Sequence, residues 1–412
     1  MLLRFALAAL LFASPAAASG HSDTLAQYQA AMQAGDAALK ANQIAEAKKN
    51  FETARTLAPQ IPQPYLKLAH IAADAGDKTE AIARLGDYAG MNKLLDLDAE
   101  FASLKTAPGY AALAARFKQN ALPLCRCKPV WHGKPDDFFI AEGLAKDGDR
   151  LFVASVKSRR IVVIANNTQT DFATLPGTLA PFGILADRTH SRLLVSAAEL
   201  RGGGAAPEHN ALLTYDLKTG ALLETIEGPK GAQIGDLALA LDGTIYLSDS
   251  NGALLRRAPG AQTLEEISHD LISPQGMVVS ADGKTLLVAD YSAGLILFDP
   301  ASRKLTPVVV PQGLTTITMD GLAQLSDGTF VATQNNIAPV RIIHFALSKD
   351  WSHLAWLKLL AVNAPNASDL SLITNDGQKA YAVGIAQWSS LAENAVDMTP
   401  PLHPWEIIEL MP

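Results

Sequence analysis

The chain has 412 residues, of which 49% are hydrophobic and only 18% are charged. This composition allows a large buried core, and the length predicts two to three domains. The formal net charge is −7, so the chain lacks the basic character that binding to a polyanion requires. Nucleic acid is therefore excluded as an expected partner.

The first 18 residues have the pattern of a secretory signal peptide. A positive charge at Arg4 precedes an uninterrupted apolar run from Phe5 to Ala13, and small residues at 16–18 form a cleavage site before Ser19. The apolar run is about nine residues long, whereas a membrane-spanning helix needs roughly 20. The pattern predicts a cleaved signal peptide at residues 1–18, no transmembrane segment, and a protein that is periplasmic or secreted.

Residues 23–120 are rich in alanine and have the periodicity of helices. Small, aromatic and helix-ending residues follow the spacing of a tetratricopeptide repeat in two successive sets, at Ala47, Phe51, Ala54 and Pro59 and then at Ala81 and Leu85. The region therefore resembles two tetratricopeptide hairpins followed by a helix near residues 110–117. Such repeats bind a peptide or partner protein in a groove. Two repeats, fewer than the three that independent stability normally requires, also suit a helical platform packed on the next domain.

Residues 121–130 are predicted to link the two domains, and they contain the only cysteines of the chain, Cys125 and Cys127. An oxidising compartment favours a disulfide between them. Because this disulfide would close a very small ring, its expected contribution to stability is under about 2 kcal/mol. The alternatives are binding of a soft metal or redox chemistry, which normally need further ligands or a lowered thiol pKa.

One sequence phrase recurs six times in the last two thirds of the chain. It starts one residue before a Gly, or before the residue that stands in place of that Gly. An apolar strand, a turn of the Asp-Gly type and a second apolar strand follow. The copies start at Glu142, Phe182, Gly235, Gln275, Asp320 and Ser368. Their spacing of roughly 40 to 55 residues is the length of one four-stranded propeller blade. We therefore predict a multidomain chain in which the helical region is followed by an all-β six-bladed β-propeller at residues 131–412.

The residues that start these phrases are the candidate functional residues, because the innermost strands of a propeller line its central channel. Two copies place an acid one position later, at Asp236 and Asp369. Four carboxylates and one carboxamide are therefore expected to gather at the channel mouth, from Glu142, Asp236, Asp320, Asp369 and Gln275. Crowded carboxylates repel one another unless they are protonated or neutralised by a cation. An all-oxygen set of this kind is what Ca²⁺ prefers, and to a lesser extent Mg²⁺ or Mn²⁺.

An acid beside a glycine also has a purely structural explanation, because its carboxylate can accept hydrogen bonds from the backbone of a turn. This explanation applies to the acids of the predicted Asp-Gly turns, which are Asp242, Asp282, Asp327 and Asp376.

Residues 130–412 resemble the superfamily of SMP-30, gluconolactonase and strictosidine-synthase-like proteins, which are six-bladed propellers. The resemblance is carried by Glu142-Gly, Gln275-Gly-Met, Asp320-Gly-Leu and the repeated Asp-Gly strand pairs. Enzymes of this superfamily hold one divalent cation with a Glu from the first blade, an Asn from a middle blade and an Asp from a later blade. The resemblance implies that Glu142, Gln275 and Asp320 are the metal ligands, with Gln275 replacing the Asn. It also implies that Asp236 contacts substrate, with Gly235 at the place of a second Asn.

The resemblance implies a metal-dependent lactonase. The expected cation, Ca²⁺, would polarise the carbonyl of a lactone or sugar-like substrate. Asp320 or Asp236 would activate a water molecule. The predicted mouth of the channel, where substrate would bind, includes Asp236, Asp369, Phe182 and Asn335. Two alternatives remain open, a non-catalytic scaffold that binds proteins through the helical repeats and the propeller, and a propeller that binds a small ligand without turnover.

Overall fold

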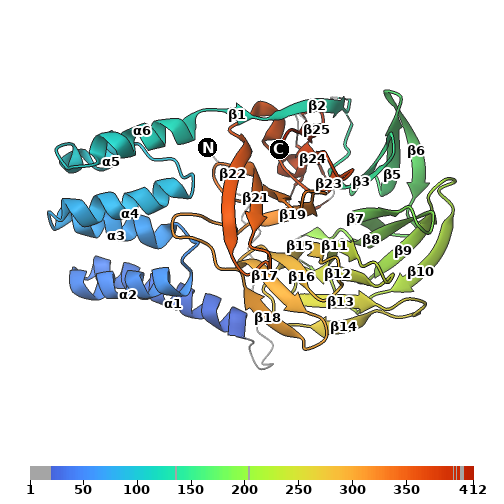
Figure 1. Cartoon of the computed structure of the whole chain (residues 1–412), viewed down its shortest axis with the longest axis horizontal. Coiled ribbons are helices and arrows are strands. Elements are labelled where there is room, and N and C mark those ends of the chain that lie inside the picture. The colour runs from blue at the N-terminus through green and yellow to red at the C-terminus, as the bar shows by residue number, and fades with distance from the viewer. Residues whose placement is uncertain (1–19, 135–136, 203–204, 393, 396, 400–402) are drawn as a thin grey trace.

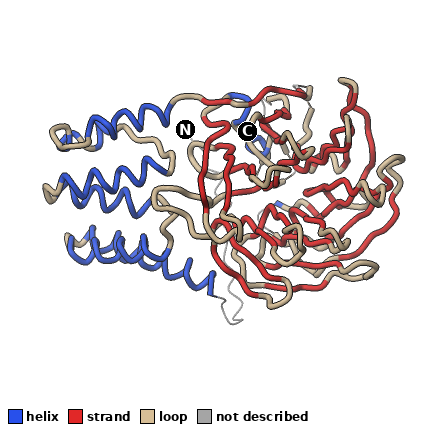
Figure 2. Tube along the Cα trace, in the orientation of Figure 1, coloured by secondary structure: helices blue, strands red, loops and turns tan. Residues whose placement is uncertain are grey.

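The structure, a computed structural model, describes residues 20–134, 137–202, 205–392, 394–395, 397–399 and 403–412. The helices lie beside a larger region made of strands (Figure 1, Figure 2). The predicted signal peptide at residues 1–18 lies outside the described residues. Of the helices in the described part of the chain, none is long and apolar enough to cross a membrane.

The predicted N-terminal helical region is confirmed. The described residues contain six α-helices, which are α1 (Gly20–Lys40), α2 (Ile44–Leu57), α3 (Gln63–Asp74), α4 (Lys78–Gly90), α5 (Leu97–Glu100) and α6 (Tyr110–Ala121). Helix α1 packs on α2, α3 packs on α4, and α6 packs on α4. Ala47, Ala54 and Ala81 are fully buried, because their small side chains let neighbouring helices approach closely. Helix α4 begins where the Asp77 carboxylate accepts a hydrogen bond from the Glu80 N–H at 3.0 Å.

The strands of the described residues form six antiparallel sheets, which confirms the predicted six-bladed propeller. Blade 1 contains β3 (Ala141–Asp147), β4 (Arg150–Ser155), β5 (Arg160–Ala165) and β6 (Thr168–Thr174). Blade 2 contains β7 (Leu179–Asp187), β8 (Arg192–Glu199), β9 (Asn210–Asp216) and β10 (Leu222–Glu227). Blade 3 contains β11 (Ile234–Leu239), β12 (Ile245–Asp249), β13 (Ala253–Arg257) and β14 (Glu265–Ser268). The innermost strands of these blades are β3, β7 and β11, and each contacts the next.

Blades 4 to 6 complete the ring. Blade 4 contains β15 (Pro274–Val279), β16 (Leu286–Asp290), β17 (Gly294–Asp299) and β18 (Lys304–Pro307). Blade 5 contains β19 (Met319–Gln324), β20 (Phe330–Gln334), β21 (Arg341–Leu347), β22 (Leu354–Val362) and β1 (Leu124–Cys125). Blade 6 contains β23 (Ile373–Asn375), β24 (Ala380–Ile385), β25 (Glu406–Leu410) and β2 (Cys127–His132). The inner strands β15, β19 and β23 continue the circle, and β23 contacts β3 of the first blade.

The ring is closed by residues that the sequence had suggested were a linker. Much of the predicted linker at 121–130 is strand, since β1 pairs with β22 of blade 5 and β2 pairs with β25 of blade 6. Arg126 joins the two blades, because its N–H donates to the Leu360 carbonyl at 2.7 Å and its carbonyl accepts from the Met411 N–H at 2.9 Å. Cys125 and Cys127 form the predicted disulfide at this seam. The strand predicted near the C-terminus is the third strand of blade 6.

In blades 1, 2, 4 and 5, neighbouring inner strands approach so closely that only glycine fits at the repeated position. A Cβ atom on Gly276 of blade 4 would lie 2.6 Å from the Leu322 nitrogen of blade 5. A Cβ atom on Gly321 of blade 5 would lie 2.6 Å from the Ile373 nitrogen of blade 6. The Gly of the repeated phrase is therefore required by packing between blades, whereas the Gly of the Asp-Gly turns, such as Gly328 with φ of +85°, provides a left-handed turn.

Hydroxyl groups on second strands tie one blade to the next. The Thr333 hydroxyl accepts a hydrogen bond from the Gly321 N–H at 2.9 Å and donates to the Ser371 carbonyl of blade 6 at 2.7 Å. The Ser196 hydroxyl makes the same two bonds, to Gly183 in its own blade and Gly235 in blade 3. These bonds hold β7 and β19 against the next blade.

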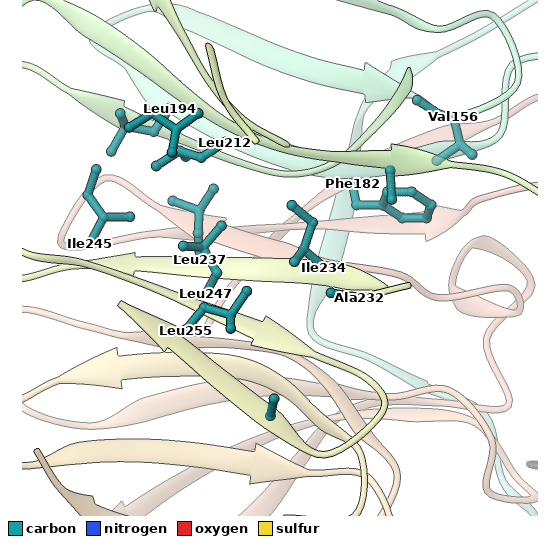
Figure 3. Packing of buried hydrophobic residues seen from close by; sticks show 14 of the residues in the cluster. Val156, Phe182, Leu194, Leu212, Ala232, Ile234, Leu237, Ile245, Leu247 and Leu255 are labelled. Carbon is teal, nitrogen blue, oxygen red and sulfur yellow. The ribbon is translucent and has the colours of Figure 1, made fainter. Parts of the chain in front are cut away.

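Apolar side chains fill the wedges between blades. Figure 3 shows the cluster between blades 2 and 3, in which Leu194 and Leu212 face Ile234 and Leu247. These four side chains are at most 1% exposed. The β-branched and leucine-rich strands of the repeated phrase thus bury both faces of each blade, which holds the channel rigid.

The helical region contacts the end of the propeller at which the inner strands begin. The Gln60 carboxamide oxygen, between α2 and α3, accepts hydrogen bonds from the Thr316 N–H and hydroxyl, both at 2.7 Å. The buried Arg341 guanidinium donates to the Met91 carbonyl at 2.6 Å. Thr316 lies just before β19 and Arg341 opens β21, so these contacts place the helices beside the channel mouth.

Candidate functional site

Glu142 lies at the start of β3 with only 8% of its surface exposed. One of its carboxylate oxygens, Oε2, accepts hydrogen bonds from the Ser371 hydroxyl and the Trp388 indole N–H. Both donors belong to blade 6, so the contact spans the seam between the first and last blades. These two donors fix the orientation of the Glu142 carboxylate.

Asp320 occupies the matching position at the start of β19 and is 9% exposed. Its Oδ2 accepts a hydrogen bond from Asn335 Nδ2 at 2.6 Å, and Asn335 Oδ1 accepts from the Tyr291 hydroxyl at 2.6 Å. Burial raises the pKa of Tyr291 well above its usual range, so the hydroxyl remains protonated and is a donor. Asn335 therefore orients the Asp320 carboxylate.

Asp236 and Gln275 come from the inner strands of blades 3 and 4. Asp236 Oδ1 accepts a hydrogen bond from the Leu237 N–H at 2.8 Å. Gln275 Nε2 donates to the Ser273 hydroxyl at 3.0 Å. The other atom of this carboxamide, Oε1, lies 3.8 Å from the place that a Cβ atom on Gly235 would occupy. The amide oxygen of Gln275 therefore extends toward the space that the missing side chain of Gly235 leaves.

The carboxyl groups of Glu142, Asp236 and Asp320 interact electrostatically. Burial and, to a smaller extent, the charge of Asp320 together raise the pKa of Glu142 to about 8. Burial also raises the pKa of Asp236 and of Asp320 to about 7 each, with added repulsion from Glu142 on Asp236 and from Asp236 on Asp320. Each shift reflects the cost of removing negative charge from water and placing like charges together.

These three carboxyls have no basic partner among the ion pairs formed by the described residues. Buried carboxylates are normally paired, because an isolated buried charge is costly. Ionisation of these acids would therefore be costly unless protons or a cation neutralised them.

The donor chemistry fits a hard divalent cation. Within the described chain, no group of three or more His, Cys, Asp and Glu side chains is arranged to hold a metal ion. The predicted set is instead mixed, with one oxygen donor each from Glu142, Asp320 and the Gln275 carboxamide, and oxygen donors of these types are those that Ca²⁺ prefers. Hydrogen bonds orient all three side chains.

Asp369 and Phe182 differ from the expectation for substrate-contacting residues. Asp369 Oδ2 accepts hydrogen bonds from the Ser389 N–H and hydroxyl, at 3.2 and 2.9 Å, which gives the carboxylate a structural role in holding the segment after β24. The Phe182 ring packs in the cluster of Figure 3 and is 8% exposed. Its contribution is to the wedge between blades rather than to a substrate surface.

The prediction that the sixth phrase starts at Ser368 is wrong by three residues. Ile373 pairs with Ala382 as Leu322 pairs with Ala332, so the residue that corresponds to Asp320 is Ser371. Ser368 is exposed.

Sequence reasoning did not assign Tyr291, Ser371 or Trp388 to the site. Tyr291 has a recognisable signal, because it directly follows the second strand of blade 4 as Asn335 follows that of blade 5. The pairing of Ser371 and Trp388 with Glu142 depends on ring closure over more than 200 residues, and no local pattern encodes it.

Known proteins resemble the chain only in fold. No protein-family model matches it, and no curated protein sequence matches it. A gluconolactonase from Xanthomonas campestris has a similar structure, with 16% identity, a TM-score of 0.45, and coverage of 71% of this chain and 99% of the other. A protein of unknown function from Bacteroides thetaiotaomicron is similar with 13% identity, a TM-score of 0.48, and coverage of 69% and 74%. A chain of the mitotic checkpoint complex is similar with 12% identity, a TM-score of 0.46, and coverage of 69% and 95%.

Proposed function

We propose that the protein is a periplasmic or secreted hydrolase of lactones or related neutral esters that depends on a divalent cation, with Ca²⁺ as the expected ion. The observation that carries this proposal is the set of three buried, mutually repelling carboxyls, Glu142, Asp236 and Asp320, without a basic partner. A cation would neutralise them at neutral pH. The Cys125–Cys127 disulfide supports an oxidising compartment.

Each residue of the site has a role in this proposal. Glu142, Gln275 and Asp320 would hold the ion, which when bound supplies Lewis-acid polarisation of a carbonyl. Ser371 and Trp388 hold the Glu142 carboxylate, and Asn335 holds that of Asp320.

Asp236 is the proposed general base, and Asp320 is the alternative. The carboxylate takes a proton from water as the water oxygen bonds to the lactone carbonyl carbon. The ring C–O bond then breaks, and the leaving alkoxide takes that proton to become a hydroxyl group.

The test combines metal content with activity. The purified mature protein is exchanged into Ca²⁺ buffer and desalted, its bound metal is measured by mass spectrometry, and hydrolysis of a lactone panel is followed. We expect about one ion per chain, and loss of both the ion and at least 100-fold of the activity in Glu142→Gln and Asp320→Asn. The matched control is Asp327→Asn, since Asp327 lies in an exposed turn. Full activity in Glu142→Gln would refute the proposal.

A second candidate function is a protein-binding scaffold, in which the helical region is a pair of tetratricopeptide-like hairpins. Burial of Ala47, Ala54 and Ala81 between paired helices favours it, as does the way the helices project from the propeller (Figure 2). Gly235 and Gln275, which replace the residues expected in an enzyme, also favour it. Absence of both bound ion and hydrolysis, together with specific peptide capture by the full chain, would support this function instead.

A further inference from the structure

A cleft of about 560 Å³ lies between the helical region and the propeller. The helical wall comes from the start of α1 and the loop after α2, and the propeller wall comes from blades 4 and 5, where α1 lies beside β18 (Figure 1). Its principal apolar side chains are Leu25, Leu57 and Ile61 on one wall and Ile272, Val309 and Ile317 on the other. The Gln60–Thr316 hydrogen bonds hold the two walls together.

The cleft is uncharged. Its described lining contains no Asp, Glu, Lys, Arg or His, and its polar side chains are limited to Thr, Ser and Gln. Val309 is 55% exposed, although most large apolar side chains of the chain are buried. A volume in the range of about 300 to 1,000 Å³ with a largely apolar lining is typical of a small-molecule site.

Three residues of the cleft lining are near neighbours in sequence of residues at the candidate functional site. Ile272 precedes Gln275 by three residues, and Ile317 precedes Asp320 by three residues. Three residues span at most about 11 Å, so the Cα atoms of Ile272 and Ile317 lie within that distance of the Cα atoms of Gln275 and Asp320, two proposed metal ligands. Ser292, another lining residue, directly follows Tyr291, whose hydroxyl bonds to Asn335.

From these features the geometry points to the cleft as a binding site for the uncharged alkyl chain of a ligand whose ester or lactone group lies at the carboxyl site. The class of ligand follows from charge. An uncharged wall is complementary to an aliphatic chain, and the neighbouring acids disfavour a carboxylate such as a fatty acid. The identity of the ester group rests on the proposed function, whereas binding of the alkyl chain does not.

The first test measures binding without catalysis. Straight-chain alkanols from hexanol to dodecanol displace the neutral fluorescent probe N-phenyl-1-naphthylamine from the full chain in EDTA. We expect affinity to rise about fourfold for each added methylene, and decanol to bind more tightly than decanoate. Val309→Asp is expected to weaken decanol binding at least tenfold, because it places a charge in the cleft.

Two further variants separate a local effect from misfolding. Ala58→Phe fills the cleft without adding charge, and it is expected to abolish the gain from the longer alkanols. Leu241→Asp makes the same chemical change as Val309→Asp at a site that is 89% exposed and not part of the lining, and it is expected to leave binding unchanged. Circular dichroism checks that each variant is folded. Equal decanol affinity in the parent and in folded Val309→Asp and Ala58→Phe would overturn the inference.

Failure of the inference and failure of the proposed function have different signatures. Alkanol binding that follows these expectations, with no lactone hydrolysis, would retain the alkyl site and reject the hydrolase. Lactone hydrolysis that is lost in Glu142→Gln, yet is indifferent to alkyl length and to Ala58→Phe, would retain the hydrolase and reject the alkyl site.

Discussion

At the scale of single residues, two positions that differ from the pattern of the superfamily resembled by the sequence lie next to each other. Gln275 has a longer side chain than the expected Asn, and Gly235 lacks the side chain expected there. The Gln275 amide oxygen lies beside the position of the missing Gly235 side chain. A Cβ atom fits at Gly235 with ordinary contacts, but a longer side chain would meet this oxygen. The long side chain of Gln275 and the missing side chain of Gly235 are therefore sterically complementary.

This complementarity predicts energetic coupling. Gly235→Asn alone is expected to lower the free energy of unfolding, because the new carboxamide collides with Gln275. Adding Gln275→Asn should recover most of the loss, with a coupling energy of about 1 kcal/mol or more. Urea denaturation of the parent, both single variants and the double variant measures this quantity. Additive effects of the two substitutions would show that the residues do not interact.

A pH dependence follows from Glu142. Its pKa rises from 4.5 in the unfolded chain to about 8 in the folded protein, so the folded state holds the proton more tightly. The resulting stability is fully present below about pH 4.5 and is lost as the pH rises through about 8. Without Ca²⁺, we expect the urea concentration at the unfolding midpoint to decrease as the pH is raised from 5 to 9.

Glu142→Gln should reduce this slope, because the amide does not titrate, and Ca²⁺ should reduce it in the parent by stabilising the ionised site. Asp327→Asn is the control, since turn hydrogen bonds lower the pKa of Asp327 instead. A slope that is unchanged in Glu142→Gln would contradict the assignment.

At the scale of elements, the repeated phrase predicted the blades well because each part of it has a local physical cause. Asp-Gly encodes a turn, and alternating apolar residues encode a buried strand. The inner strand of the last blade was missed because Ser368-Asp369-Leu370 resembles the phrase, while the true inner strand has Leu372 where blades 1, 2, 4 and 5 have Gly. Register in that blade is set by pairing with β24, which a single-chain pattern does not contain.

The close approach of inner strands predicts large effects of small substitutions. Gly321→Ala is expected to lower the free energy of unfolding by about 1 to 3 kcal/mol, because its Cβ would overlap the backbone of blade 6. The matched control is Gly86→Ala in α4, where the same Cβ meets nothing within 4 Å. That change should stabilise the protein by about 0.5 to 1 kcal/mol. Chemical denaturation of both variants measures the contrast, and equal effects would show that blade spacing tolerates the methyl group.

At the scale of the whole molecule, sequence patterns predicted the two regions but not how they meet. The contacts of Gln60 with Thr316 and of Arg341 with Met91 join residues about 250 positions apart. They depend on tertiary packing rather than on any periodicity. The same holds for the site, where the sequence placed Glu142 and Asp320 at equivalent strand starts but gave no sign of the blade 6 residues that hold Glu142.

Closure of the ring by β2 and β25 has a consequence for biosynthesis. Glu142 and its partner Ser371 are 229 residues apart, so the ribosome has made five blades before the hydroxyl that orients the acid exists. The strand β2, made early, has no partner until Glu406–Leu410 emerges. A nonsense codon shortly before this segment would therefore leave an open ring with hydrated, misplaced acids at its centre. In genetic terms, the final codons that encode β25 are as necessary to the site as the codon for Glu142 itself.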